Sequence, residues 1–111
     1  MTVGKICEHG LDNLALCIAV PTGATYRLVS VSCKLAAAPT TSEDYTITLD
    51  ARGGEMFDTL LYSVDPSVTS DTDLFWQPDN ELLMEGGDSV AVAFTNTDAT
   101  TYGVQVTLKR V

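Results

Sequence analysis

The sequence has few basic residues and no long apolar run. Its 111 residues include 6 lysines and arginines against 15 aspartates and glutamates, a formal net charge of −9. Nucleic-acid binding depends on lysine and arginine to neutralise phosphates, so this balance argues against a nucleic-acid partner. No apolar stretch approaches the roughly 20 residues that cross a bilayer, and the N-terminal residues show no basic region followed by an apolar one. We therefore expect neither a membrane span nor a secretion signal.

The motifs of catalysis and cofactor binding are also missing. His9 is the only histidine, and no recognisable nucleophile motif accompanies it. The glycine pairs at 53–54 and 86–87 lie between expected strands, which indicates turns and not phosphate-binding loops. Aromatic residues make up only 7% of the chain, too few to line a sugar cleft between paired carboxylates. We predict that the protein is not an enzyme and uses no cofactor.

The three cysteines form no C-x-x-C pair. Cys7, Cys17 and Cys33 are an odd number, and the favoured interpretation is reduced, buried thiols that act as small apolar residues. The alternative, a metal site at Cys7 and His9 with Cys17, lacks the spacing of a structural zinc site. Unpaired thiols fit synthesis in a reducing cytoplasm.

Carboxylates are concentrated between residues 65 and 88. The members of this group are Asp65, Asp71, Asp73, Asp79, Glu81, Glu85 and Asp88. They do not match the EF-hand pattern, so the favoured interpretation is a solvated acidic rim, with a calcium site at Asp71 and Asp73 as the alternative. We predict no dedicated metal site.

Most of the chain alternates between apolar and polar residues with a period of two, which is typical of strands with one buried face. The expected strands are 14–20, 26–35, 45–51, 56–64, 74–76, 81–84, 89–94 and 102–109. Residues 11–20 fit either a helix or a strand, and the turn that follows favours a strand. Residues 65–73 have loop composition. About eight short strands without a helix predict an all-β fold, an antiparallel two-sheet sandwich of jelly-roll type, with a closed barrel as the alternative.

We divide the chain into an N-terminal arm, residues 1–13, and a single β-sandwich domain, residues 14–111. The arm is polar and weakly patterned, and we expect it to become ordered on docking, so that its deletion leaves folding intact and weakens assembly. Residues 89–94 and 102–108 are expected to form a hairpin.

Apolar residues on both faces of 56–64 suggest that another protein covers this strand. Trp76 fits three roles: a core residue, an interface anchor or a platform for a sugar ring. The predicted interface residues are Met56, Leu60, Tyr62, Phe75 and Trp76. We expect a homo-oligomer or a complex with a larger partner.

Five segments together resemble small β-sandwich structural proteins of tailed bacteriophages. They are residues 21–31, 37–50, 73–79, 85–94 and 102–106, and the resemblance covers about residues 15–110. It implies a virion protein, in first place a capsid decoration or cement protein that binds the major capsid protein and stabilises the shell. Such proteins are often trimers. The resemblance leaves open a neck, tail or fibre-associated protein, and a carbohydrate- or receptor-binding module remains a further alternative.

Overall fold

The computed structural model describes residues 3–10, 13–52, 56 and 58–111, and for residues 3–9 it describes the backbone. Nine strands and one short helix lie in this part of the chain. They are β1 (Val3–Gly10), β2 (Leu14–Ala19), β3 (Thr25–Leu35), β4 (Tyr45–Asp50), β5 (Thr59–Val64), α1 (Pro66–Thr69), β6 (Asp73–Trp76), β7 (Leu82–Glu85), β8 (Ser89–Phe94) and β9 (Tyr102–Arg110).

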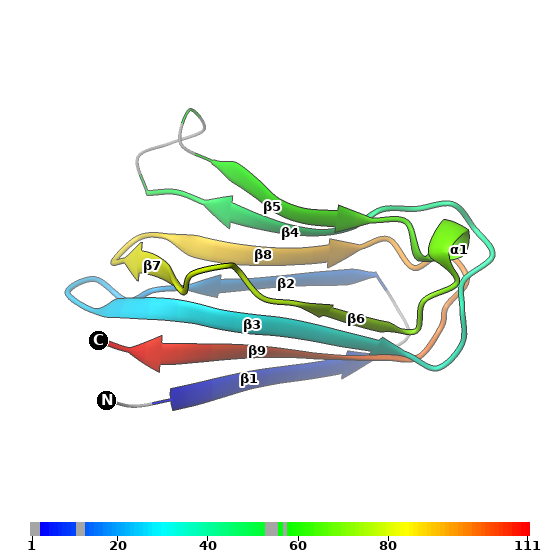
Figure 1. Cartoon of the computed structure of the whole chain (residues 1–111), viewed down its shortest axis with the longest axis horizontal. Helices are drawn as coiled ribbons and strands as arrows, with labels where there is room; N and C mark the ends of the chain where they lie inside the picture. The colour runs from blue at the N-terminus through cyan, green and yellow to red at the C-terminus, as the bar shows by residue number, and fades with distance from the viewer. Residues whose placement is uncertain (1–2, 11–12, 53–55, 57) are drawn as a thin grey trace.

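The strands form two antiparallel sheets that pack against each other (Figure 1). The first sheet has the order β1-β9-β3-β6, and β7 pairs with β3 beside β6. The second has the order β2-β8-β4-β5. This confirms the predicted all-β sandwich and the choice of a strand over a helix for β2.

The core lies between the sheets and consists of the inward residues of the alternating strands. In β9, all four residues that were expected to share a face are buried: Tyr102, Val104, Val106 and Leu108. Their partners on β3 include Val31 and Cys33, which are fully buried. Each large apolar side chain buried in this way contributes about 1.5–3 kcal/mol to the hydrophobic term. Strict alternation along residues 26–35 would place Val29 on the same face, but it lies at a β-bulge between Leu28 and Ser30 and is only half-buried.

The predicted hairpin of 89–94 and 102–108 is wrong. β8 pairs with β2 and β4, whereas β9 pairs with β1 and β3, so residues 95–101 carry the chain from one sheet to the other. Alternation with a period of two shows which residues face the core. It does not distinguish a strand pair within one sheet from two strands in facing sheets.

The N-terminal segment that was assigned to an arm contains strand β1. It pairs with β9 from Val3–Lys109 to Gly10–Tyr102 without a register shift. Backbone hydrogen bonds define such a pair, and hydrophobic patterning does not reveal them. Truncation at residue 10 removes an edge strand and leaves one side of β9 unpaired, so we no longer expect folding to be unaffected.

Residues 65–73 contain one helical turn, α1, where loop was expected. Asp65 caps its first turn by accepting a hydrogen bond from the Ser67 amide at 3.0 Å, and Pro66 fixes the first helical residue. Ser70 ends the turn in a left-handed conformation with φ 59°. Among the described residues, no helix has the length and apolar character that crossing a membrane requires.

Candidate interaction surfaces

Two of the predicted interface residues meet where the edges of the two sheets come together. Tyr62 lies on β5 and Trp76 on β6, and their rings stack with centroids 6.4 Å apart and planes 29° apart. Tyr45 of β4 meets Tyr62 edge-to-face, also at 6.4 Å. Offset and edge-to-face pairs of this kind contribute about 0.5–1.5 kcal/mol beyond burial. Trp76 is half-buried and packs against the core, so it is not a fully buried core residue.

The other three predicted interface residues lie apart from this pair and from one another. Phe75 points outward from the first sheet, in register with Ser32, and is 56% exposed. Leu60 is in register with Thr48 of the second sheet and is 59% exposed. Met56, in the connection between β4 and β5, is 92% exposed. The five residues therefore do not form a single patch.

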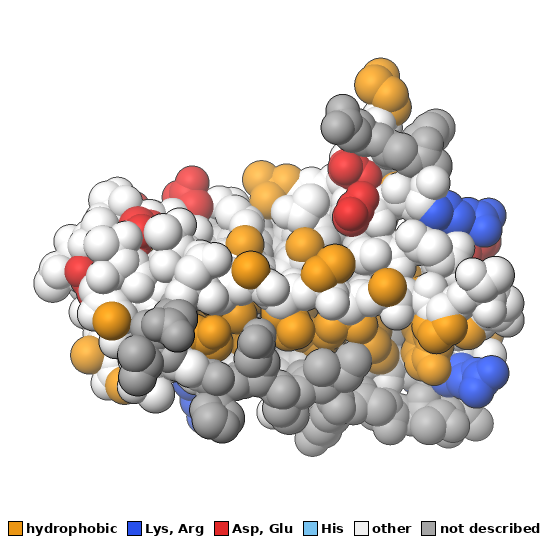
Figure 2. All heavy atoms as spheres, turned by 180° about the vertical axis from the view of Figure 1, so that it is seen from behind, with side chains coloured by type: hydrophobic (Ala, Val, Ile, Leu, Met, Phe, Trp, Pro, Cys, Tyr) orange, Lys and Arg blue, Asp and Glu red, His pale blue; other side chains and the backbone are white. Residues whose placement is uncertain are grey.

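Sequence reasoning missed the outer face of the second sheet. We call it the small-residue face. Its members are Ala15, Cys17, Ala19, Thr46, Thr48, Leu60, Ser63, Ser89, Ala91 and Ala93, and one row runs Cys17–Ala91–Thr48–Leu60 across the four strands. Among the outward residues of these strands, Asp50 at the end of β4 is the one charged side chain. Figure 2, seen from behind, shows small hydrophobic side chains along the middle of the view, with charged side chains mostly above them and at the ends.

The outer face of the first sheet has a different character. Arg27 and Lys109 are cross-strand neighbours there, and Lys34 is in register with Asp73. Lys109 also contacts Glu81 at 3.5 Å. The two faces of the sandwich are thus charged on one side and almost uncharged on the other. The sequence signal for the second face was the run of small residues that alternates with Val90, Val92 and Phe94 on β8.

Comparison with known proteins gives no relative: no protein-family model matches the chain, and no curated protein matches it.

The cysteines differ in their surroundings. Cys33 is fully buried, as expected, and burial raises the pKa of its thiol to about 12, so it stays protonated at neutral pH. Cys17 was expected to be buried, but it lies exposed on the small-residue face. The alternative metal site at Cys7 and His9 involves side chains outside the described residues.

The carboxylates between residues 65 and 88 are spread over several different loops. In the part of the chain whose side chains are described, no three Asp, Glu, His or Cys residues gather in a way that could hold a metal ion. Asp71 and Asp73, the alternative calcium ligands, are both exposed, and Asp73 lies in register with Lys34. Asp65 accepts hydrogen bonds from Ser42 and Ser67, which lowers its pKa. Asp65 therefore links the β3–β4 connection to the cap of α1.

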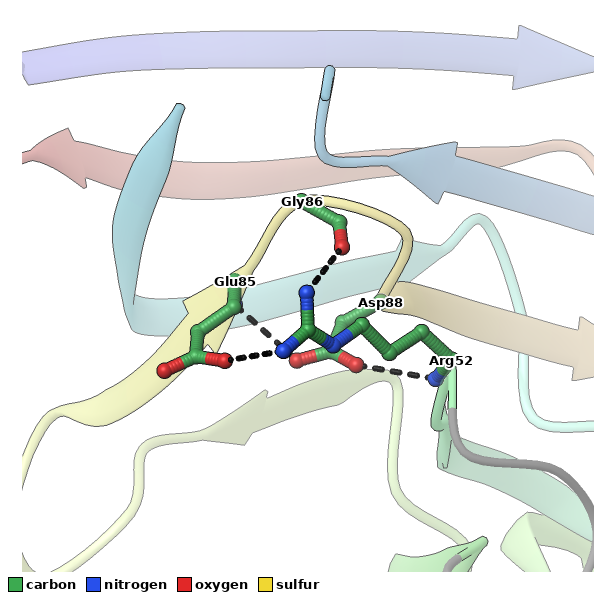
Figure 3. Close-up of polar contacts among 4 residues, drawn as sticks. All are labelled: Arg52, Glu85, Gly86 and Asp88. Atoms are coloured by element: carbon green, nitrogen blue, oxygen red, sulfur yellow. Dashed lines mark hydrogen bonds and ion pairs between the residues drawn. The ribbon is translucent and has the colours of Figure 1, made fainter. Parts of the chain in front are cut away.

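Asp88 organises the turn between β7 and β8 (Figure 3). Its carboxylate accepts hydrogen bonds from the amides of Arg52 and Glu85, both at 2.9 Å, and these bonds lower its pKa. The Arg52 guanidinium pairs with the Glu85 carboxylate at 3.0 Å and donates to the Gly86 carbonyl at 3.4 Å. The cluster joins the end of β4 to a turn that connects the two sheets.

Asp98 links two connections that cross between the sheets. Its carboxylate accepts hydrogen bonds from the amides of Thr40 and Thr41, at 2.7 and 2.9 Å, and from the Thr41 hydroxyl at 2.6 Å. Glu43 makes the reciprocal contact by accepting from the amide and hydroxyl of Thr97, at 3.0 and 2.6 Å. Hydrogen bonds to the charged form, chiefly from Thr41, lower the pKa of Asp98 to about 2.

We expect Asp98 to make stability depend on pH in acid. A carboxylate whose pKa is lowered from 3.8 to about 2 by folding stabilises the protein above its ordinary pKa. That contribution is lost as pH falls through this interval. The free energy of unfolding should therefore decrease from about pH 4 towards pH 2, and Asp98→Asn should show a shallower decrease and lower stability at pH 7. Urea unfolding from pH 7 to pH 2 measures both, and identical pH profiles for the two proteins would contradict the assignment.

Tyr45 carries a buried hydroxyl that finds no hydrogen-bond partner among the described residues. Its ring is fully buried, and burial together with the nearby Cys33 and Tyr62 raises its pKa well above the usual range. A buried polar group without a partner costs about 1–3 kcal/mol. Tyr45→Phe removes the hydroxyl and keeps the contact with Tyr62, so we expect about 1 kcal/mol of added stability in urea unfolding. A loss of 1 kcal/mol or more would show that the hydroxyl has a favourable interaction.

Proposed function

We propose that the protein is a structural component of a bacteriophage particle, a capsid decoration protein that binds and stabilises the major capsid shell. The observation that carries this proposal is the small-residue face. It offers a broad sheet surface, with one charged residue at its end, in a chain whose net charge is −9. The resemblance of residues 15–110 to phage β-sandwich proteins supports the same conclusion.

The small-residue face suits docking onto a flat protein surface. Alanine, serine and threonine side chains allow close backbone approach, and facing sheets pack about 10 Å apart. Burial of the apolar part of this surface contributes about 25 cal/mol per Å², and the near absence of charge avoids the desolvation penalty of buried charge. Association costs offset part of this gain, but a lattice of shell subunits repeats the contact many times. The acidic loops would then face away and keep particles apart by repulsion.

The proposed partners are the major capsid protein, or other virion proteins, and further copies of the chain in a homo-oligomer. Phe75, Leu60 and Met56 supply exposed apolar side chains for such contacts, whereas Tyr62 and Trp76 supply only their outer edges. The protein would be made in the bacterial cytoplasm and function in the virion.

The test uses particles from a phage that lacks the gene for this chain. We expect these particles to release DNA at a lower temperature than complete ones, and added purified protein should bind them and restore the release temperature. Equal release temperatures together with no binding would overturn the proposal. Binding confined to the neck or tail, seen by electron microscopy of labelled protein, would replace the decoration role with a neck or tail role.

A further inference from the structure

The free edge of the second sheet lacks the features that keep edge strands from pairing. β5 ends the order β2-β8-β4-β5, and its six residues, TLLYSV, contain no charge and no proline. Edge strands of soluble proteins are usually protected by charges, proline or shortness. In the other sheet, the edge strand β6 has only four residues and includes Asp73, and the edge strand β1 includes Lys5 and Glu8. The second edge strand of the same sheet as β5, β2, is also uncharged, but its register with β8 contains no bulge. In Figure 1, β5 forms the upper edge of the molecule, whereas β2 is seen between β8 and β3.

A β-bulge gives β5 an arrangement of side chains that is symmetric about its centre. The register with β4 shifts between Ile47 and Thr48, and Leu61 is the extra residue. Thr59, Tyr62 and Val64 pair with the inward residues Leu49, Ile47 and Tyr45, whereas Leu60 and Ser63 pair with the outward residues Thr48 and Thr46. Leu61 packs against the core beside Tyr62. Along β5, residues 60 and 63 therefore lie on the outer face of the sheet, and residues 59, 61, 62 and 64 lie on the side of the core.

This symmetry makes β5 complementary to itself. In an antiparallel pair, directly opposite residues lie on the same face of the sheet. A two-fold axis between Leu61 and Tyr62 places Leu60 opposite Ser63 of a second copy, both outward. It also places Thr59 opposite Val64 and Leu61 opposite Tyr62, all inward. A six-residue strand without the bulge would oppose inward and outward residues in this register.

We propose that two copies of this chain associate through antiparallel pairing of β5 with β5 about a two-fold axis. The contact joins two four-stranded sheets into one of eight strands and buries the exposed apolar surface of Leu60. The small-residue faces of the two copies then form one continuous surface. The inference does not rest on the proposed function.

Charge favours this edge as the contact between copies. Two chains of net charge −9 repel each other, and a contact between uncharged strands such as β5 keeps this repulsion small. Asp58 and Asp65 flank the strand and would lie opposite each other in the two copies, but their carboxylates accept hydrogen bonds within their own copy, from the Ala51 amide and from Ser42 and Ser67. The remaining repulsion is screened by salt, so the dimer should become tighter as ionic strength rises.

The test is sedimentation velocity of the full chain at several protein and salt concentrations, with paired variants. We expect a reversible dimer of twice the 11.9 kDa chain mass. The double variant L60K/S63K places two lysine pairs directly opposite across the axis, and should raise the dissociation constant by on the order of tenfold. The variant L60K/S63E converts both pairs to opposite charges and should restore the dimer.

The matched control puts the same charges on the outer face of the other sheet, in L83K/Q105K, at two residues outside the proposed contact. It should leave the dissociation constant unchanged. A monomer at every concentration, a trimer, or equal weakening by the control would overturn the proposal, as would a failure of L60K/S63E to restore association while circular dichroism shows a native fold. These measurements use the isolated protein, so their failure would leave the particle-binding test standing.

Discussion

Lysine in place of Ala93 is expected to abolish binding to the phage shell. Ala93 lies exposed on β8, a central strand of its sheet, between Ala15 on β2 and Thr46 on β4. A lysine side chain at that point would either keep the small-residue face away from the shell surface or be buried between them as an unpaired charge. Burial of an unpaired charge costs several kcal/mol, so binding should weaken by about 100-fold or more.

The matched control for Ala93→Lys is Gln105→Lys. Gln105 lies on β9, a central strand of the other sheet, in register with Ser32 on the outer face that already carries Arg27, Lys34 and Lys109. We expect Gln105→Lys to bind particles like the wild type, in cosedimentation with particles that lack the protein. Equal binding by the two variants would remove the small-residue face from the docking contact, and equal loss would point to an effect of charge alone.

Alanine at Gly86 is expected to cause a large loss of stability for the addition of a single methyl group. A Cβ atom built there would lie 2.9 Å from the Pro21 carbonyl oxygen and 3.0 Å from the Thr22 Cα, both backbone atoms of the β2–β3 turn. Backbone cannot rotate away as a flexible side chain can, so the two turns must separate. Overpacking of this kind costs about 1–3 kcal/mol. The carbonyl of Gly86 also accepts from Arg52, so the polar cluster at this turn would shift as well.

Gly103→Ala provides the comparison for Gly86→Ala. Gly103 lies in β9, and a Cβ there would meet no atom within 4 Å. Because glycine within a strand is less favourable than alanine by roughly 0.5–1 kcal/mol, this variant should be as stable as the wild type or slightly more stable. Thermal unfolding should give a clearly lower melting temperature for Gly86→Ala than for Gly103→Ala. Similar melting temperatures for both would show that the β2–β3 and β7–β8 turns are not closely packed.

The sequence predicts the fold class because alternation is strong in the central strands. On β9, every second residue from Tyr102 to Leu108 is apolar, and all four are buried. The same rule cannot assign strands to sheets, which is why β8 and β9 were paired wrongly. It also missed β1, whose pairing with β9 depends on backbone hydrogen bonds.

Candidate contact residues were harder to predict than core residues. Hydrophobicity drew attention to Trp76 and Tyr62, yet these rings stack on each other across the two sheet edges. Leu60 is the one large side chain of the small-residue face, and it was predicted as an interface residue. The other members of the face are too small to be recognised singly in the sequence. It becomes visible only when the register aligns Ala15 with Ala93 and Cys17 with Ala91. The symmetry of β5 could not be predicted either, because it depends on the bulge at Leu61, which changes which residues share a face.

Quantitative mass spectrometry of purified particles from the source tests the central claim most directly. The measurement compares the copy number of this chain with that of the major capsid protein in the same particles. A decoration role predicts comparable copy numbers, because such a protein repeats across the shell. A few copies per particle would contradict the decoration role in favour of the neck or tail, and complete absence from particles would contradict a role in the virion.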